Sequence, residues 1–214
     1  RYRFLETIRE YALAKLAEAG ETLRLRHRHL DLFLARAEEA GPKLFDAYQQ
    51  LWLNWLEGEH DNIRAALAWA LECGRIEAGL RLAIALPRFW EIRGYVQEAL
   101  TWFERLFAHA DEEVSLAIRV NAFTYAAFLA HFMGKAAATI AYGRKAVALA
   151  ESAGDEGQPL LAFALSGLSS GTEALGDFQT TFALQERVVQ LTRSSSEDLI
   201  LLGMALLVQG GTAI

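Results

Sequence analysis

The sequence predicts an all-α protein in which antiparallel pairs of helices stack on one another. Helix-favouring residues dominate and only three of the 214 residues are proline, so helix propensity is high along nearly the whole chain. Apolar residues recur at helical spacing in successive segments, and glycines separate these segments. Because one helix pair cannot bury its apolar face alone, neighbouring pairs are expected to pack together.

The N-terminal 40 residues predict the end of a strand followed by two helices. Residues 1–5 alternate apolar and basic side chains, as in a strand. Helical spacing then begins, and Gly20 is a natural stop for the first helix. A second helix is expected over about 21–40, where Gly41 and Pro42 would end it.

Residues 41–75 predict a helical hairpin. Two helices are expected to join near Gly58, and Asp61 or Asn62 is a plausible N-cap of the second. This capping role explains the polar segment EGEHDN better than acid–base chemistry, because consecutive residues on a helix diverge. Gly74 would close the hairpin.

Residues 76–214 predict a series of repeats, each with a helix, a turn glycine and a second helix. The turn glycines recur at intervals of roughly 40 residues; they are Gly94, Gly134, Gly176 and Gly210. Glycine suits these turns because a positive φ is costly for other residues. Pro87 is expected to bend the first of these helices. The last repeat is cut short and no polar cap follows it, so we expect the natural protein to continue.

Charge and composition exclude several classes of protein. The net charge of -6 argues against direct binding of nucleic acid, which requires basic groups that neutralise phosphates. Residues 1–36 are nevertheless basic, with eight Lys or Arg against five Asp or Glu. No apolar run is long enough to span a bilayer, no signal peptide is present, and Cys73 is the single cysteine. We therefore expect a cytoplasmic protein that does not bind membranes.

The second helices of the repeats, such as YVQEALTWFERL and KAAATIAYGRKAVALAESAGD, resemble tetratricopeptide repeats in outline. Gly143 stands where that family usually has an aromatic residue. The resemblance implies a right-handed superhelical stack, a tetratricopeptide-like α-solenoid, over residues 76–214.

A second resemblance is carried by four segments of the N-terminal half: RYRFLETIREYALAKLAEAGE, RHRHLDLFLARAEEAGP, WLNWLEGEHDNIRAALAWALE and RLAIALPRFWEIRGYVQEALTWFERLF. In this order they resemble the region that follows the ATPase and winged-helix domains of bacterial STAND-class regulators, which are related to LuxR and AfsR. The resemblance implies that residues 1–40 are connector helices after a winged-helix domain. It also implies that the repeats sense an inducer or a protein partner.

We expect no cofactor and no catalytic centre in this chain. A Walker A motif is absent, because Ala136 follows Gly134 and Lys135 where that motif requires serine or threonine. No nucleophile–base pair stands out. His27 and His29 do not suggest a metal site, because residues two apart on a helix point in different directions.

Two sets of candidate binding residues follow from the predicted repeats. Arginines of the second predicted helix are expected to dock on a neighbouring domain of the same protein; they are Arg24, Arg26 and Arg28. Residues of the first helix of each repeat are expected to line a concave groove; they are Arg81, Arg88, Glu91, Asn121, Thr124, Phe128, His131, Ser166, Ser170 and Glu173. We expect a small inducer or a protein partner in this groove.

These patterns favour the ligand-sensing and protein-interaction arm of an ATPase-type transcriptional regulator. The alternative is an independent tetratricopeptide scaffold that binds a peptide or helix of a partner. An enzyme ranks third.

Overall fold

The structure is a computed structural model that describes residues 6–193, and all regular elements in this range are helical. The prediction of an all-α protein is thus confirmed for the described residues. In chain order the helices are α1 (Glu6–Glu18), α2 (Thr22–Lys43), α3 (Gln49–Glu72), α4 (Ile76–Ile84), α5 (Pro87–Arg93), α6 (Val96–Phe107), α7 (Leu116–Phe132), α8 (Ala136–Ser152), the 3-10 turn η1 (Gly154–Glu156), α9 (Gln158–Ala174) and α10 (Phe178–Arg193).

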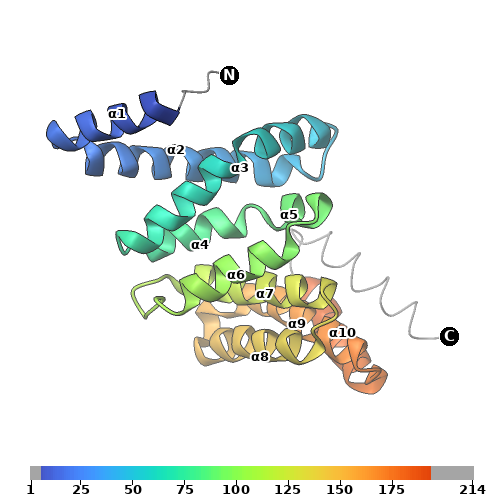
Figure 1. Cartoon of the computed structure of the whole chain (residues 1–214). Helices are drawn as coiled ribbons and strands as arrows, with labels where there is room; N and C mark the ends of the chain where they lie inside the picture. The colour runs from blue at the N-terminus through green and yellow to red at the C-terminus, as the bar shows by residue number, and fades with distance from the viewer. Residues whose placement is uncertain (1–5, 194–214) are drawn as a thin grey trace.

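The helices form layers that follow the order of the chain. Figure 1 shows α1 and α2 at one end of the molecule and α8, α9 and α10 at the other. Most helices that follow one another in the sequence pack together, and α7 contacts both α8 and α9. The predicted strand at residues 1–5, the glycine turn at Gly210 and the truncated last repeat lie outside the described residues.

The turn glycines have the backbone conformation that their positions predict. Gly94, Gly134 and Gly176 have φ angles of 79°, 68° and 73°. In each turn, the residue after the glycine donates its N–H to a carbonyl of the preceding helix; the bonds are Tyr95 to Trp90 (2.8 Å), Lys135 to Ala130 (2.9 Å) and Asp177 to Thr172 (3.0 Å). This is the Schellman arrangement, in which a left-handed residue lets the chain satisfy the last carbonyls of a helix.

The predicted hairpin within residues 41–75 is wrong, because α3 continues through Gly58 as a single helix. Asp61 and Asn62 lie in the interior of this helix and are not N-caps. A glycine inside a helix costs about 1 kcal/mol relative to alanine. The buried side chains of Leu56 and Ile63, before and after the glycine, stabilise the continuous helix.

Pro87 interrupts its helix and does not merely bend it. The segment divides into α4 and α5, and Pro87 is the first residue of α5. This position suits proline, since the first N–H of a helix has no partner within the helix. The bend predicted from the sequence is therefore corrected to a break.

Two clusters of buried apolar side chains form the core. The larger cluster extends from α2 to α7, and its largest fully buried side chains are Trp90, Phe89 and Phe103. The smaller one joins α7, α8, α9 and α10. The core is thus shared along the array, as expected for helix pairs that cannot bury their faces alone.

Glycines allow α8 and α9 to approach closely. A Cβ atom on Gly143 would lie 2.6 Å from Cα of Leu168, and one on Gly171 would lie 3.0 Å from the backbone nitrogen of Ile140. Real Cβ atoms do not approach a backbone carbon to 2.6 Å. The tight packing of α8 on α9 therefore explains why a glycine occupies position 143, where the repeat pattern predicts an aromatic residue.

Several hydrogen bonds between layers join residues that are 38 apart in the sequence. Within the described range these are Tyr95 Oη to Glu57 (2.7 Å), Lys135 Nζ to Gln97 (3.2 Å), Tyr142 Oη to Glu104 (3.1 Å) and the Ser115 N–H to Glu77 (2.9 Å). Other hydrogen bonds between layers join residues 34 to 46 apart, so successive layers are related by similar but not identical steps. The spacing agrees with a chain built from repeated helix pairs.

Candidate functional site

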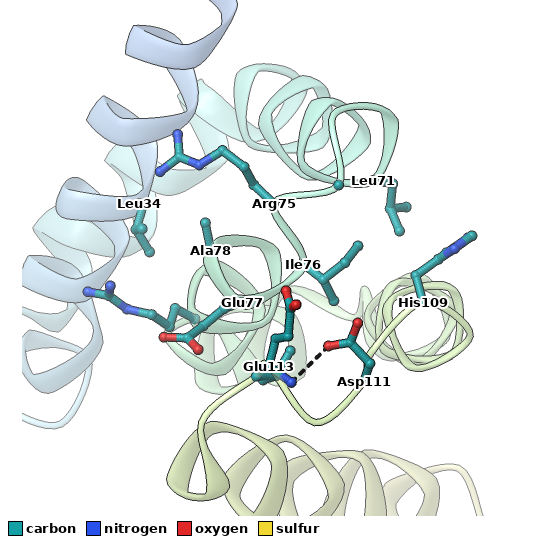
Figure 2. Close-up of a pocket in the computed structure, with 12 residues that line it drawn as sticks. Leu34, Leu71, Arg75, Ile76, Glu77, Ala78, His109, Asp111 and Glu113 are labelled. Atoms are coloured by element: carbon teal, nitrogen blue, oxygen red, sulfur yellow. Dashed lines mark hydrogen bonds between the residues drawn. The ribbon is translucent and has the colours of Figure 1, made fainter.

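A cavity of about 600 Å³ opens between α2, α4 and the loop that joins α6 to α7. Figure 2 shows side chains from these elements converging on it. Its apolar lining comes from the side chains of Leu34, Leu71, Ile76, Ala78 and Val114. The volume lies in the range typical of small-molecule sites, so the cavity is a candidate binding site.

Both guanidinium groups of the cavity are already paired, and His109 is the third basic side chain of its lining. Arg75 lies 2.7 Å from Asp31 of α2, and Arg81 lies 2.6 Å from Glu38 of the same helix. These ion pairs connect α4 and the turn before it to α2. Their positive charges are therefore largely neutralised on this side of the cavity.

The acidic groups of the cavity have no ion-pair partner among the described residues. Glu77 accepts a hydrogen bond from the Ser115 N–H at 2.9 Å, and this bond anchors the start of α7. Asp111 accepts one from the Glu113 N–H at 3.0 Å, drawn as a dashed line in Figure 2. The Glu113 side chain lines the same cavity and is exposed. These carboxylates give the cavity an acidic side, whereas its apolar residues Leu34, Ile76 and Val114 are buried in the core.

The predicted groove residues do not form one continuous accessible surface. Thr124 and Ser166 are buried, and their hydroxyls donate to the carbonyls of Val120 and Ala162 in their own helices. A ligand at the surface cannot reach these two side chains in this structure. Of the ten residues, Arg81 is the one that also lines the cavity described above.

The remaining groove candidates are partly buried. Arg88 lies 2.9 Å from Glu91, Ser170 donates to the carbonyl of Ser166, and the ring of Phe128 lies 5.7 Å from that of Phe163. The other members are half-buried: Asn121, His131 and Glu173. Binding of a ligand by these residues stays a prediction.

The three arginines predicted to dock on a neighbouring domain are exposed on α2. Arg24 pairs with Glu21, one turn away. Arg26 pairs with Glu72 at 2.8 Å, and its guanidinium lies 4.8 Å from the centre of the Trp69 ring. Docking itself stays a prediction.

The histidines of the second predicted helix contact aromatic side chains of the core. The His27 ring lies 5.5 Å from that of Trp69, and the His29 ring lies 4.6 Å from that of Phe33. Among residues 6–193, no three histidine, cysteine or acidic side chains are grouped as metal ligands. In the same range, no helix is both long enough and apolar enough to cross a bilayer.

A partly buried polar network connects α3 to α6. His60 is only 5% exposed, and its Nε2 lies 3.3 Å from Oε1 of Glu98 without making a hydrogen bond. Arg64 donates two hydrogen bonds to Glu98, at 2.8 and 2.6 Å, and these bonds lower the pKa of that carboxyl group. Trp102 donates a further one at 3.3 Å. The network holds two layers together through the segment that sequence reasoning treated as a helix cap.

We expect acidification to destabilise the fold through His60. Burial lowers the pKa of its imidazole below 6.5, so the unfolded chain takes up a proton at a higher pH than the folded chain. The stability that the neutral His60 imidazole contributes is fully present above the pKa of histidine in the unfolded chain. It is lost as the pH falls toward the lower pKa of His60 in the folded chain. Urea unfolding should therefore give a lower free energy at about pH 5.5 than at about pH 7.5.

Variants distinguish His60 from the other groups that titrate in this range. The His60→Gln variant should show a weaker pH dependence of the free energy of unfolding than the original chain. Burial also lowers the pKa of His29, so part of the dependence should remain in the His60 variant. Equal pH dependence in the His60 variant and the original chain would contradict this assignment.

The acidic half of the cavity was missed by the sequence analysis. Glu77, Asp111 and Glu113 come from two separate segments, and only the folded chain brings them to one cavity. The acidic run DEEVS in residues 111–115 was the available signal. A charged loop between two helices is usually solvated, so this signal does not by itself identify a site.

Comparison with known proteins gives one group of relatives. Three curated proteins, one from Mycobacterium bovis and two from strains of Mycobacterium tuberculosis, are each 35% identical to 81% of this chain. All three are named as proposed HTH-type transcriptional regulators. This chain is similar to part of such regulators. It spans 20% of their length, and no family model matches it.

Proposed function

We propose that this chain is a ligand-sensing and protein-interaction arm of a signal-responsive, ATPase-type transcriptional regulator of the STAND class. The similarity to proteins named as HTH-type regulators carries this proposal, because it extends over 81% of the chain but only 20% of each relative. The remaining length of such a regulator would hold the ATPase and DNA-binding parts. The arm itself would be non-catalytic and would bind no cofactor.

The fold supports a tetratricopeptide-like arrangement for this arm. Glycine turns of one type occur at Gly94, Gly134 and Gly176, and several of the hydrogen bonds that connect the layers join residues 38 apart. Stacks of helix pairs offer extended surfaces for binding. A right-handed superhelix with a concave groove is the form that we propose for residues 76–214.

The proposed mechanism is a shift between two arrangements of the arm and the neighbouring ATPase and winged-helix domains. A ligand can shift this equilibrium only if it binds one arrangement more tightly than the other. The exposed arginines of α2, among them Arg28, would contact an acidic surface of the neighbouring domain. We place this regulator in the bacterial cytoplasm.

The Arg88→Ala and His131→Ala variants test the groove. In the full-length regulator, we expect the double variant to lower induction of a reporter gene at least fivefold at a fixed signal concentration, the effect of losing about 1 kcal/mol of binding. Arg144→Ala is the matched control, since Arg144 is an exposed basic residue on α8. Unchanged induction in the double variant would show that the groove does not sense the signal.

A second candidate function is an independent scaffold that binds a peptide or helix of a partner protein. Exposed apolar side chains around the turn from α2 to α3 favour it, since Phe45, Tyr48 and Leu51 are 64%, 58% and 65% exposed. The coding sequence upstream of residue 1 separates the two functions. A Walker A motif and a winged helix there would support the regulator, and a start codon close by would support the scaffold.

A further inference from the structure

A second cavity, of about 290 Å³, lies between the end of α6, the loop that follows it, α7 and α8. Most of its apolar lining is partly exposed; these side chains are Phe107, Ala110, Phe123 and Leu149. The rings of Phe107 and Phe123 are stacked, with 4.2 Å between their centres. Leu80 also lines the cavity but is fully buried in the core. The partly exposed side chains give the cavity an apolar wall that a ligand can reach.

Arg119 of α7 lines this cavity and lacks a partner for its guanidinium group. Its Nε is buried, and the group makes no hydrogen bond or ion pair with any of residues 6–193. The other arginines without a carboxylate partner, among those whose side chains the structure describes, are exposed to solvent; they are Arg28, Arg105 and Arg144. Arg119 is half-buried, where an unpaired polar group costs free energy. A carboxylate suits it best, because both charge and geometry match a guanidinium group.

Two acidic side chains of the α6–α7 loop line the same cavity. They are Asp111 and Glu112, both exposed, and neither forms an ion pair with Arg119. The Asp111 carboxylate accepts a hydrogen bond from the N–H of Glu113 at 3.0 Å, which holds it at the loop. The cavity thus presents an unpaired cation, separate unpaired carboxylates and an apolar wall.

We propose that this cavity binds a free amino acid with an apolar side chain. The carboxylate of such a ligand would pair with Arg119, and its ammonium group would pair with Asp111 or Glu112. Its side chain would pack on the rings of Phe107 and Phe123. A ligand with a single charge would leave either the guanidinium group or the carboxylates without a partner.

The size of the cavity agrees with this ligand. A volume of about 290 Å³ lies near the lower end of the range for small-molecule sites and is too small for a folded partner. The inference gives the proposed sensing arm a ligand class, and in that sense it rests on the proposed function. Binding itself depends only on the cavity, so it can be tested on this chain alone.

Three phenyl compounds of similar size test the proposal on the complete 214-residue chain. Phenylalanine carries both charged groups, phenethylamine lacks the carboxylate, and 3-phenylpropanoate lacks the ammonium group. Binding can be followed by NMR shifts of residues around the cavity. We expect phenylalanine to bind about fivefold more tightly than either of the other two, because it alone pairs with both kinds of charge.

The Arg119→Met variant removes the guanidinium group and keeps an apolar side chain in its place. It should weaken the binding of phenylalanine and of 3-phenylpropanoate about tenfold, which corresponds to about 1.4 kcal/mol. It should leave the binding of phenethylamine unchanged. Arg144→Met is the matched control, since Arg144 is an exposed arginine that does not line this cavity. Circular dichroism would verify that both variants remain folded.

The Glu112→Gln variant should have the complementary effect. It should weaken the binding of phenylalanine and of phenethylamine about threefold, a smaller loss because an exposed ion pair is worth less. It should not weaken the binding of 3-phenylpropanoate. Glu113→Gln is the matched control, because Glu113 is the exposed neighbouring carboxylate, does not line this cavity and changes the net charge equally.

Three outcomes would overturn the proposal: no binding of phenylalanine, equally tight binding of a probe with one charge, or equal binding of phenylalanine by the Arg119 variant and its control. The comparison of the three probes needs no variant, so it decides even if the Arg119 variant does not fold. None of these outcomes bears on the regulatory function, which the reporter experiment with Arg88 and His131 tests separately.

Discussion

Replacing Trp90 with alanine should lower the free energy of unfolding by about 3–5 kcal/mol, the range found for large aromatic side chains in protein cores. Trp90 is fully buried between layers, and its ring lies 6.5 Å from that of Phe103. Removal of the indole would leave a cavity where α5 packs on α6. Urea denaturation followed by circular dichroism would measure the change.

The Trp90→Phe variant should be much less damaging. The indole N–H of Trp90 is buried and has no hydrogen-bond partner, so phenylalanine removes an unsatisfied donor and keeps most of the apolar contact. Alanine at Trp52, which is only partly buried, should also cost less than alanine at Trp90. If the alanine variants at the two positions were equally stable, the assignment of Trp90 to the core would be wrong.

Replacing Gly143 with leucine should lower the free energy of unfolding by about 1–3 kcal/mol, the usual cost of overpacking a well-packed interior. A Cβ at this position would lie 2.6 Å from Cα and 2.9 Å from the backbone nitrogen of Leu168. Backbone atoms of a packed helix cannot move aside as a flexible side chain can. The added side chain would therefore push α8 away from α9, and denaturant titration would report the loss.

The control for Gly143 is Ala148→Leu on the same helix. Ala148 is exposed, so the larger side chain adds bulk without entering the interface and changes helix propensity little. The two variants thus add the same side chain to the buried and exposed faces of α8. Equal stability of the two would contradict the close packing of α8 on α9.

Local sequence signals were sufficient for the glycine turns but not for every helix boundary. The end predicted for the second helix at Gly41 and Pro42 is wrong, because α2 continues through both residues to Lys43. Gly94, Gly134 and Gly176 were identified as turn residues because a positive φ depends on the residue itself and its immediate neighbours. The same reasoning wrongly predicted a turn at Gly58. Gly58 lies inside α3, where burial of Leu56 and Ile63 on either side of it stabilises a continuous helix.

The sequence by itself determined the all-helical fold over residues 6–193 and the positions of its glycine turns, since both follow from propensity and backbone sterics. Only the tertiary structure decided which polar groups meet. It brought Glu77, Asp111 and Glu113 to one cavity, placed His60 next to Glu98, and buried Thr124 and Ser166. Contacts between distant segments depend on how layers pack, and periodicity within one helix does not specify that packing.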